Sequence, residues 1–246
     1  RIEEVMILFM IAAEDPNIVI RVNGFFGINQ LIKKDPLVEN KIEKILSLFI
    51  KGAKDADICI RKESLFGISE LIKHGKLPIG RIEESLNLFI EGTKDRYPYV
   101  QKEGFLGISY LIEKGILPSS AIGLALDLFI EGLRYNDDIL RKEAIFGIIK
   151  LIDNDQLLVL RVKLEEILSL LKKFTSLDNH NSVIHNAVIA IGKLAEKSII
   201  PEHHIAEILD ILVTKKEDGT LFFTGITEAE KAEISAITDG TLITKI

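Results

Sequence analysis

The sequence predicts an all-α solenoid of paired helices, and two observations lead to this fold class. The first is a fixed period, because four phenylalanines follow one another at intervals of 40 residues: Phe9, Phe49, Phe89 and Phe129. Periods of this size are typical of small units stacked in a row. The second is that each period contains two stretches whose apolar residues recur at helical spacing. Together they predict about five and a half two-helix repeats.

The first half of each period has the pattern of an amphipathic helix. Its signature, Ile-Glu followed by Leu-Phe, occurs in residues 42–49 and again in residues 82–89. Between residues 42 and 53 the apolar side chains fall on one side, while Glu43, Lys44 and Lys51 fall on the other. We therefore expect first helices near residues 2–13, 41–53, 81–93, 121–133, 163–175 and 204–215.

The second half of each period repeats as faithfully and predicts a second helix. Its pattern of Arg, a large apolar pair, Gly and Ile occupies residues 21–28 and returns in residues 61–68. Gly75 and Pro78 follow, and these residue types end a helix and prevent its continuation. The repeated glycines inside the helices indicate close approach between neighbouring backbones. We expect second helices near residues 18–34, 58–74, 98–114, 138–153 and 182–197.

With two helices per period, residues 1–213 resemble the HEAT and armadillo-like families of α-solenoids, the HEAT form more closely. An acidic and a basic residue stand where HEAT-like repeats carry a pair that forms a ladder along the stack: Asp15 with Arg21, and Asp55 with Arg61. The third unit departs from this pattern at Gln101 and the fourth at Tyr135. The resemblance implies a scaffold, transport adaptor or regulatory subunit, and in a minority of cases a nucleic-acid-binding protein or an enzyme.

The pattern predicts two domains, a repeat domain at residues 1–216 and a C-terminal segment at residues 217–246. The second contains two Asp-Gly-Thr-Leu turns with expected strands, and a capping box at Thr227–Glu230 that predicts a helix through about Ile237. We expect this segment to be a small α/β cap that buries Phe222 and Ile234 against the last repeat helix. The beginning of a further domain and a partly disordered tail are the alternatives.

At the N-terminal end, the repeat pattern is present from the first residues. Arg1 already stands in the repeat phase, without a capping residue or a polar helix before it. Because solenoids normally end in atypical repeats that shield the core, we expect the natural protein to continue upstream, or a processed or unlisted segment to be missing.

Composition narrows the function classes. Hydrophobic residues make up 47% of the chain, yet no apolar run approaches the roughly 20 residues that span a bilayer. The net charge of −6 argues against sequence-independent nucleic-acid binding, which needs a cationic surface. The single cysteine, Cys59, excludes an intramolecular disulfide and fits a reducing compartment, so we expect a cytoplasmic protein.

Motifs for catalysis or cofactor binding are not found in the sequence. It has no phosphate loop, nucleophile elbow, His-Glu-x-x-His helix or Cys-x-x-Cys pair. Nothing near Cys59 would activate it, which favours a small hydrophobic role. His203 and His204 are adjacent at an expected helix start, so their rings should point in different directions and a metal site is not expected. We expect a non-enzymatic chain without a cofactor.

The second helices carry the candidate binding residues. A large apolar side chain recurs near the middle of their polar side: Phe26, Phe66, Leu106 and Phe146. Cations and one tyrosine accompany it: Lys62, Lys102, Lys142 and Tyr110. The recurring apolar side chains either pack against the neighbouring repeat as part of the core, or form an apolar strip along the groove that suits a peptide or a helix.

The function expected from this pattern is a scaffold or adaptor, built as a right-handed superhelix, that binds a protein or peptide along its concave groove. The alternatives are a nucleic-acid-binding protein that uses the groove lysines, and the repeat region of a larger signalling enzyme. A glutamate beside each lysine, at positions 63, 103 and 143, weakens the nucleic-acid alternative. The partner, the pathway and the oligomeric state are not encoded in any motif.

Overall fold

The computed structural model describes residues 2–34, 41–175, 181–201, 203–204, 208, 213–215 and 221–223. The chain divides into two compact units, Arg1–Leu128 and Phe129–Ile246. The boundary falls inside helix α7 (Ile122–Arg134), and each unit is considered by itself.

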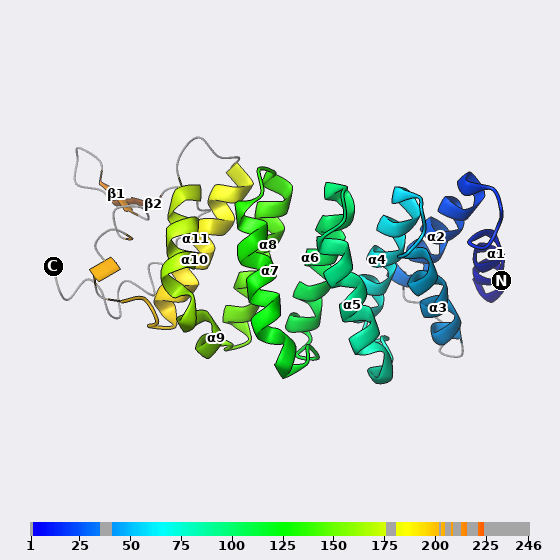
Figure 1. The fold of residues 1–246 in the computed structure, drawn as a ribbon, viewed down its shortest axis with the longest axis horizontal. Coiled ribbons are helices and arrows are strands. Elements are labelled where there is room, and N and C mark those ends of the chain that lie inside the picture. Colours follow the sequence, from blue (N-terminus) through cyan, green and yellow to red (C-terminus); the bar gives the residue numbers. More distant parts are fainter. Residues whose placement is uncertain are drawn as a thin grey trace. The chain divides into compact units, whose positions relative to one another are not determined.

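Unit 1 contains three helix pairs, which Figure 1 shows from blue to green. They are α1 (Ile2–Ala12) with α2 (Ile18–Lys33), α3 (Ile42–Gly52) with α4 (Ile58–Lys73), and α5 (Ile82–Thr93) with α6 (Pro98–Glu113). Short 3-10 turns, η2 (Ile79–Arg81) and η3 (Ser119–Ala121), lead into α5 and α7. The second helices pack on one another in order, α2 on α4 and α4 on α6.

Unit 2 continues the helical pattern with α8 (Asp138–Asp153), α9 (Leu157–Val162), α10 (Leu164–Phe174) and α11 (Asn181–Glu196). Helix α11 packs against both α8 and α10. Two short strands, β1 (Val213–Lys215) and β2 (Leu221–Phe223), pair antiparallel, with Thr214 opposite Phe222.

The predicted all-α repeat fold is confirmed, and the ten repeat helices predicted between residues 2 and 197 begin and end within one or two residues of the observed positions. Helix α9 was not predicted. Side-chain caps fix the starts of three second helices, α2, α4 and α8. The carboxylate of Asp57 accepts from the backbone N–H groups of Cys59 and Ile60, and Asn17 caps α2 in the same way. Helix α6 begins on Pro98, which suits a first helical turn.

The C-terminal predictions need correction. A helix at 204–215 is wrong at its end, because Val213–Lys215 is a strand that pairs with Leu221–Phe223. The β-branched residues Val213 and Thr214 suit that strand. The strand expected after the first Asp-Gly turn is confirmed at β2. The helix at 227–237 and the last strand lie outside the described residues, so the α/β cap has no support, and the domain boundary at 216 and the handedness of the stack stay predictions.

In each of the first four helix pairs, a phenylalanine ring of the first helix packs directly against a glycine of the second. The pairs are Phe9 with Gly27, Phe49 with Gly67, Phe89 with Gly107, and Phe129 with Gly147. In all four, a Cβ added to the glycine would overlap the phenylalanine ring, and the last three rings are completely buried. The expectation that these glycines permit close helix approach is therefore confirmed.

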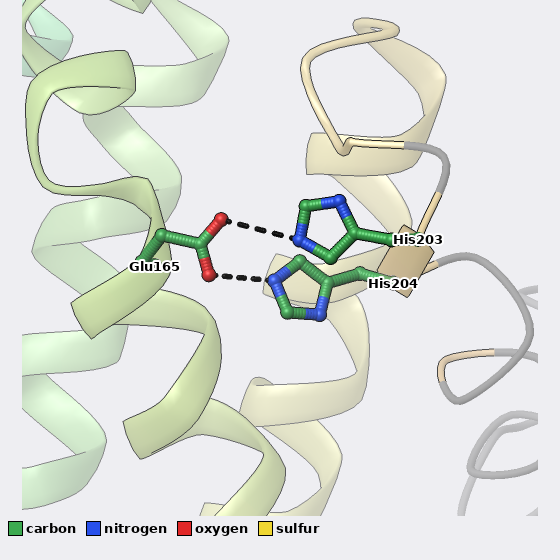
Figure 2. A group of neighbouring side chains, drawn as sticks. All are labelled: Glu165, His203 and His204. Carbon is green, nitrogen blue, oxygen red and sulfur yellow. Dashed lines mark hydrogen bonds and ion pairs between the residues drawn. The ribbon is translucent and has the colours of Figure 1, made fainter.

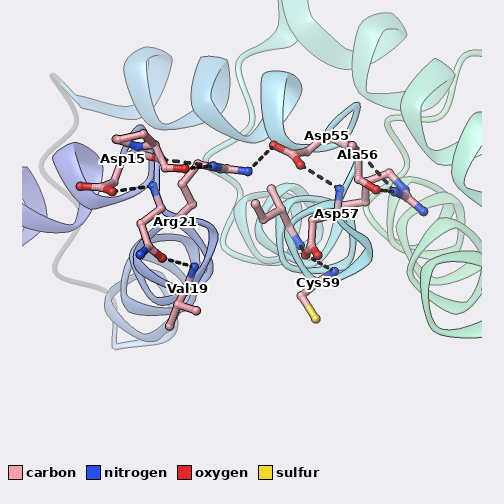
Figure 3. A network of polar contacts seen from close by, with 11 residues as sticks. Asp15, Val19, Arg21, Asp55, Ala56, Asp57 and Cys59 are labelled. Atoms are coloured by element: carbon pink, nitrogen blue, oxygen red, sulfur yellow. Dashed lines mark hydrogen bonds and ion pairs between the residues drawn. The ribbon is translucent and has the colours of Figure 1, made fainter.

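The acid–base ladder is present in unit 1, and it joins one repeat to the next (Figure 3). Arg21 Nη2 lies 3.5 Å from the carboxylate of Asp55. Arg61 makes two hydrogen bonds to Asp95, of 2.8 and 3.1 Å, and its pKa is raised chiefly by that carboxylate. Each arginine also donates to two carbonyls of its own turn. Gln101 stands in the arginine position of the third repeat, so the row of arginines is interrupted there, and the next arginine at this position is Arg141.

Candidate functional site

The recurring apolar positions on the second helices are neither core nor fully solvated. Phe26 on α2 is 50% exposed, and Phe66 on α4 and Leu106 on α6 are half-buried. The residues on either side of each one are buried. Because α2, α4 and α6 pack in order, these three side chains mark one layer of adjoining helices in unit 1. Phe146 on α8 is half-buried in the same way in unit 2.

Lysines from the last turn of one second helix lie over aromatic rings of the next. Lys33 Nζ is 4.5 Å from the ring centre of Phe66, and Lys73 Nζ is 4.5 Å from that of Tyr110. Burial alone would lower the pKa of Lys73, but hydrogen bonds with Glu70 and Tyr110 outweigh it and raise that pKa. We name the half-exposed Phe26, Phe66, Leu106 and Tyr110 with Lys33 and Lys73 the aromatic–lysine face.

Two of the three predicted groove lysines form ion pairs with the neighbouring glutamates. Lys62 Nζ lies 3.0 Å from Glu63 Oε1, and Lys102 Nζ lies 3.6 Å from Glu103 Oε1. Burial alone would lower the pKa of Lys62. The hydrogen bond and the charge of Glu63 outweigh burial, so the pKa of Lys62 is raised. Asn29 of the preceding repeat also donates to Glu63 Oε2 over 2.9 Å. The carboxylates lie deeper than the ammonium groups, so the lysine ends are the accessible charges.

The remaining predicted residues belong to unit 2. Lys142 is exposed on α8, and Phe146 lies on the same helix, where Lys150 Nζ is 4.8 Å from its ring centre. The sequence prediction missed Lys33 and Lys73 in unit 1. They could have been found, because they recur one period apart and each lies seven residues after the recurring phenylalanine.

A second polar cluster lies in unit 2, where His203 and His204 approach Glu165 at the start of α10 (Figure 2). His204 Nε2 is 2.6 Å from Glu165 Oε2, and His203 Nε2 is 3.7 Å from Glu165 Oε1. The ring centres are 4.2 Å apart. The expectation that the two rings point in different directions was therefore wrong.

The contacts of this cluster favour a hydrogen bond from His204 to Glu165 over a cation site. Lys172 Nζ lies 3.1 Å from His204 Nδ1, and a lysine ammonium can only donate. Nδ1 must then accept, which places the proton on Nε2 and directs it to Glu165. A metal ion at Nε2 would need the lone pair that this proton occupies.

Replacing His204 by alanine is expected to raise the pKa of Glu165 towards the ordinary carboxyl value. The hydrogen bond from His204 is the largest cause of the lowered pKa, ahead of the charges of His203 and Lys172. Because the folded pKa is lowered, this contact stabilises the fold fully above the ordinary pKa, and the contribution is lost as pH falls through the lowered value. NMR titration of the Glu165 carboxyl measures the shift. His203→Ala, the matched control, should move it less, and an equal shift in both variants would contradict the assignment.

The fold is shared with solved helical repeat proteins. A designed armadillo repeat protein in complex with the peptide (KR)4 matches 96% of this chain and 98% of its own, at 20% identity and a TM-score of 0.66. A computationally designed armadillo repeat protein for modular peptide recognition matches 94% and 97%, at 19% identity and a TM-score of 0.61. The MAST/Orbit N-terminal domain matches 96% of both chains, at 14% identity and a TM-score of 0.51.

At the level of sequence, no protein-family model and no curated protein matches the chain. Among the residues that the structure describes, no helix has the length and apolar character that a bilayer crossing requires.

Proposed function

The chain has the armadillo/HEAT-like helical repeat fold, and from this premise we propose that it is a non-enzymatic scaffold that binds a protein or peptide along its second helices. The observation that carries the proposal is the aromatic–lysine face. Large apolar side chains recur there once per repeat, and they are half-exposed where their sequence neighbours are buried. Regularly spaced apolar anchors are what an extended peptide or a helix needs.

The charges of this face favour an acidic peptide with apolar side chains. The lysine ammonium groups are the accessible ends, whereas the carboxylates of Glu63, Glu70 and Glu103 lie deeper and pair with lysines. An incoming carboxylate would meet Lys33 beside the ring of Phe66, whereas at Lys73 it would have to compete with Glu70. Structures of the same fold support peptide binding in general, since one was solved with a bound peptide and another was designed for modular peptide recognition.

The ion pairs also bear on the nucleic-acid alternative. Lys62 and Lys102 are already paired with glutamates, so binding a phosphate would have to compete with a carboxylate at each position. A peptide carboxylate would meet the same competition, but duplex binding depends on many phosphate contacts, whereas a peptide can also use the apolar anchors. The peptide scaffold is therefore the function that the face supports best.

Changing Phe26 and Phe66 together to serine is expected to weaken binding of a peptide of alternating Glu and Leu by about 30-fold or more. Loss of two anchors at hot-spot strength corresponds to about 2 kcal/mol. Fluorescence anisotropy with the full chain measures the affinity, and thermal unfolding should change little because both rings are partly solvated.

Three controls make this test decisive. Leu158→Ser alters an exposed apolar side chain on α9 and should leave peptide affinity unchanged. A peptide of alternating Lys and Leu should bind more weakly than the acidic one. Equal binding by the double variant would refute the proposal, and so would a large loss of its stability. Steeply salt-dependent binding of a DNA probe, lost on changing Lys62 and Lys102, would favour the nucleic-acid alternative.

A further inference from the structure

A second row of apolar side chains borders the aromatic–lysine face in unit 1. It lies at the starts of the second helices, at positions one period apart: Val19 is 63% exposed, Cys59 is exposed and Tyr99 is 61% exposed. Figure 3 shows Val19 and Cys59 at corresponding places on α2 and α4. Because this exposure recurs in three successive repeats, it belongs to the repeat and not to one of its ends. We name Val19, Cys59 and Tyr99 the outer row.

The outer row and the recurring apolar positions share one side of each second helix. In each repeat a member of the outer row stands seven residues before a recurring apolar residue: Val19 before Phe26, Cys59 before Phe66, and Tyr99 before Leu106. Seven residues make nearly two turns, so the two rows lie on the same side of the helices, about 10 Å apart along the helix axis. An α-helix with its side chains is about 10–12 Å across. A helix laid across α2, α4 and α6 can therefore contact both rows at once.

Cations occupy the position between the two rows in the second and third repeats. Lys62 and Lys102 follow the outer row by three residues. Both lysine side chains are more exposed than those of the glutamates that they contact. Val22 stands at this position in the first repeat. The surface between the rows therefore has an apolar end on α2 and a cationic end on α4 and α6.

The spacing of the second helices matches the heptad of an α-helix. Helices packed side by side are about 8–10 Å apart, and seven residues of a helix advance about 10.5 Å. A partner helix laid along the stack therefore presents one heptad to each repeat. Residues three and four positions after a central residue lie on either side of it. A central glutamate can thus face a lysine while two leucines face the two apolar rows.

We propose that the partner at the aromatic–lysine face is an acidic amphipathic helix whose heptads have the form Glu-x-x-Leu-Leu-x-x. This inference rests on the proposed function and specifies the partner's conformation, its residue pattern and its acidic end. The partner glutamates lie over Lys62 and Lys102. An ammonium group has three donors, so each lysine can bridge the partner's carboxylate and the chain's own. The heptad over α2 carries leucine in place of glutamate, because it faces Val22.

Synthetic peptides of three heptads, with alanine and glutamine at the remaining positions, test this pattern on the full chain. The matched peptide has leucine at the central position of its first heptad and glutamate at those of the other two. Fluorescence anisotropy should show it binding about 10-fold tighter than a peptide of the same composition whose leucines are moved out of the heptad. The Cα chemical shifts of the bound matched peptide, isotopically labelled, should be helical. Extended shifts would overturn the proposal.

Tyr99→Ser tests the outer row. It should weaken binding of the matched peptide about 10-fold and leave thermal unfolding nearly unchanged, because the side chain is largely exposed. Ile79→Ser alters an exposed apolar side chain outside both rows, and this matched control should leave the affinity unchanged. Equal affinities of the two variants would contradict a role of the outer row and overturn the proposal.

Val22→Lys tests which end of the partner is acidic. The unaltered chain should prefer the matched peptide about fivefold over one with glutamate at all three central positions, and Val22→Lys should reverse this preference. The same preference in both chains would overturn the proposal. If the peptide of alternating Glu and Leu binds through Phe26 and Phe66 and the matched peptide binds no tighter, the helix inference fails and the scaffold function stands. If neither peptide binds, the proposed function fails as well.

Discussion

Phe89→Ala is expected to destabilise the protein by about 3–5 kcal/mol. The ring is completely buried in α5 and lies where a Cβ on Gly107 of α6 would fall, so its removal leaves a cavity that no neighbouring side chain fills. Chemical denaturation of the full chain, followed by circular dichroism, measures the loss of unfolding free energy.

Phe26→Ala is the matched control for this substitution. It removes the same side chain from a position that is half exposed, and it should cost about 1 kcal/mol or less. If both variants lose the same stability, the aromatic–lysine face is part of the core, and the binding role proposed for it fails as well.

Gly104→Ala is expected to destabilise by about 2–3 kcal/mol, although alanine is the better helix former. A Cβ at Gly104 would lie 2.7 Å from the carbonyl oxygen of Phe89 and 2.8 Å from the carbonyl carbon of Gly92. These are backbone atoms, which cannot rotate away as a side-chain tip can, so α5 and α6 would have to separate. Thermal unfolding of the variant measures the effect.

Gly192→Ala should have the opposite sign. Gly192 lies inside α11, and a Cβ there would meet no atom of the described residues within 4 Å. Its replacement should stabilise by about 0.5–1 kcal/mol, the usual difference in helix propensity. Stabilisation by both substitutions would show that α5 and α6 do not approach each other as closely as described.

The sequence was sufficient to locate the repeat helices because each one is specified several times over. Periodic apolar residues, a recurring cap such as Asp57, and breakers such as Gly75 all point to the same boundaries. Where only one signal exists, the prediction fails. Helix α9 was not expected, because its short apolar stretch shows no period, and the segment at 213–215 was extended as helix although β-branched residues and a pairing partner favour a strand.

The candidate site was only partly predictable for a different reason. Helical angles identify which residues of one helix share a side, so Phe26 and Phe66 could be found from spacing alone. Contacts between helices depend on how the helices pack. Lys33 reaches the ring of the following repeat, and His204 meets a carboxylate 39 residues away, and no local pattern reports either distance.

The phenylalanine–glycine pairs also bear on how such a chain can change over evolutionary time. Because Phe49 with Gly67 and Phe89 with Gly107 make the same contact in successive helix pairs, an exchange of one pair for another as a whole block keeps this contact. A single substitution at either member is poorly tolerated, whereas duplication or exchange of a complete 40-residue segment preserves every ring and its glycine together. The architecture therefore favours recombination at repeat boundaries over gradual drift of its core.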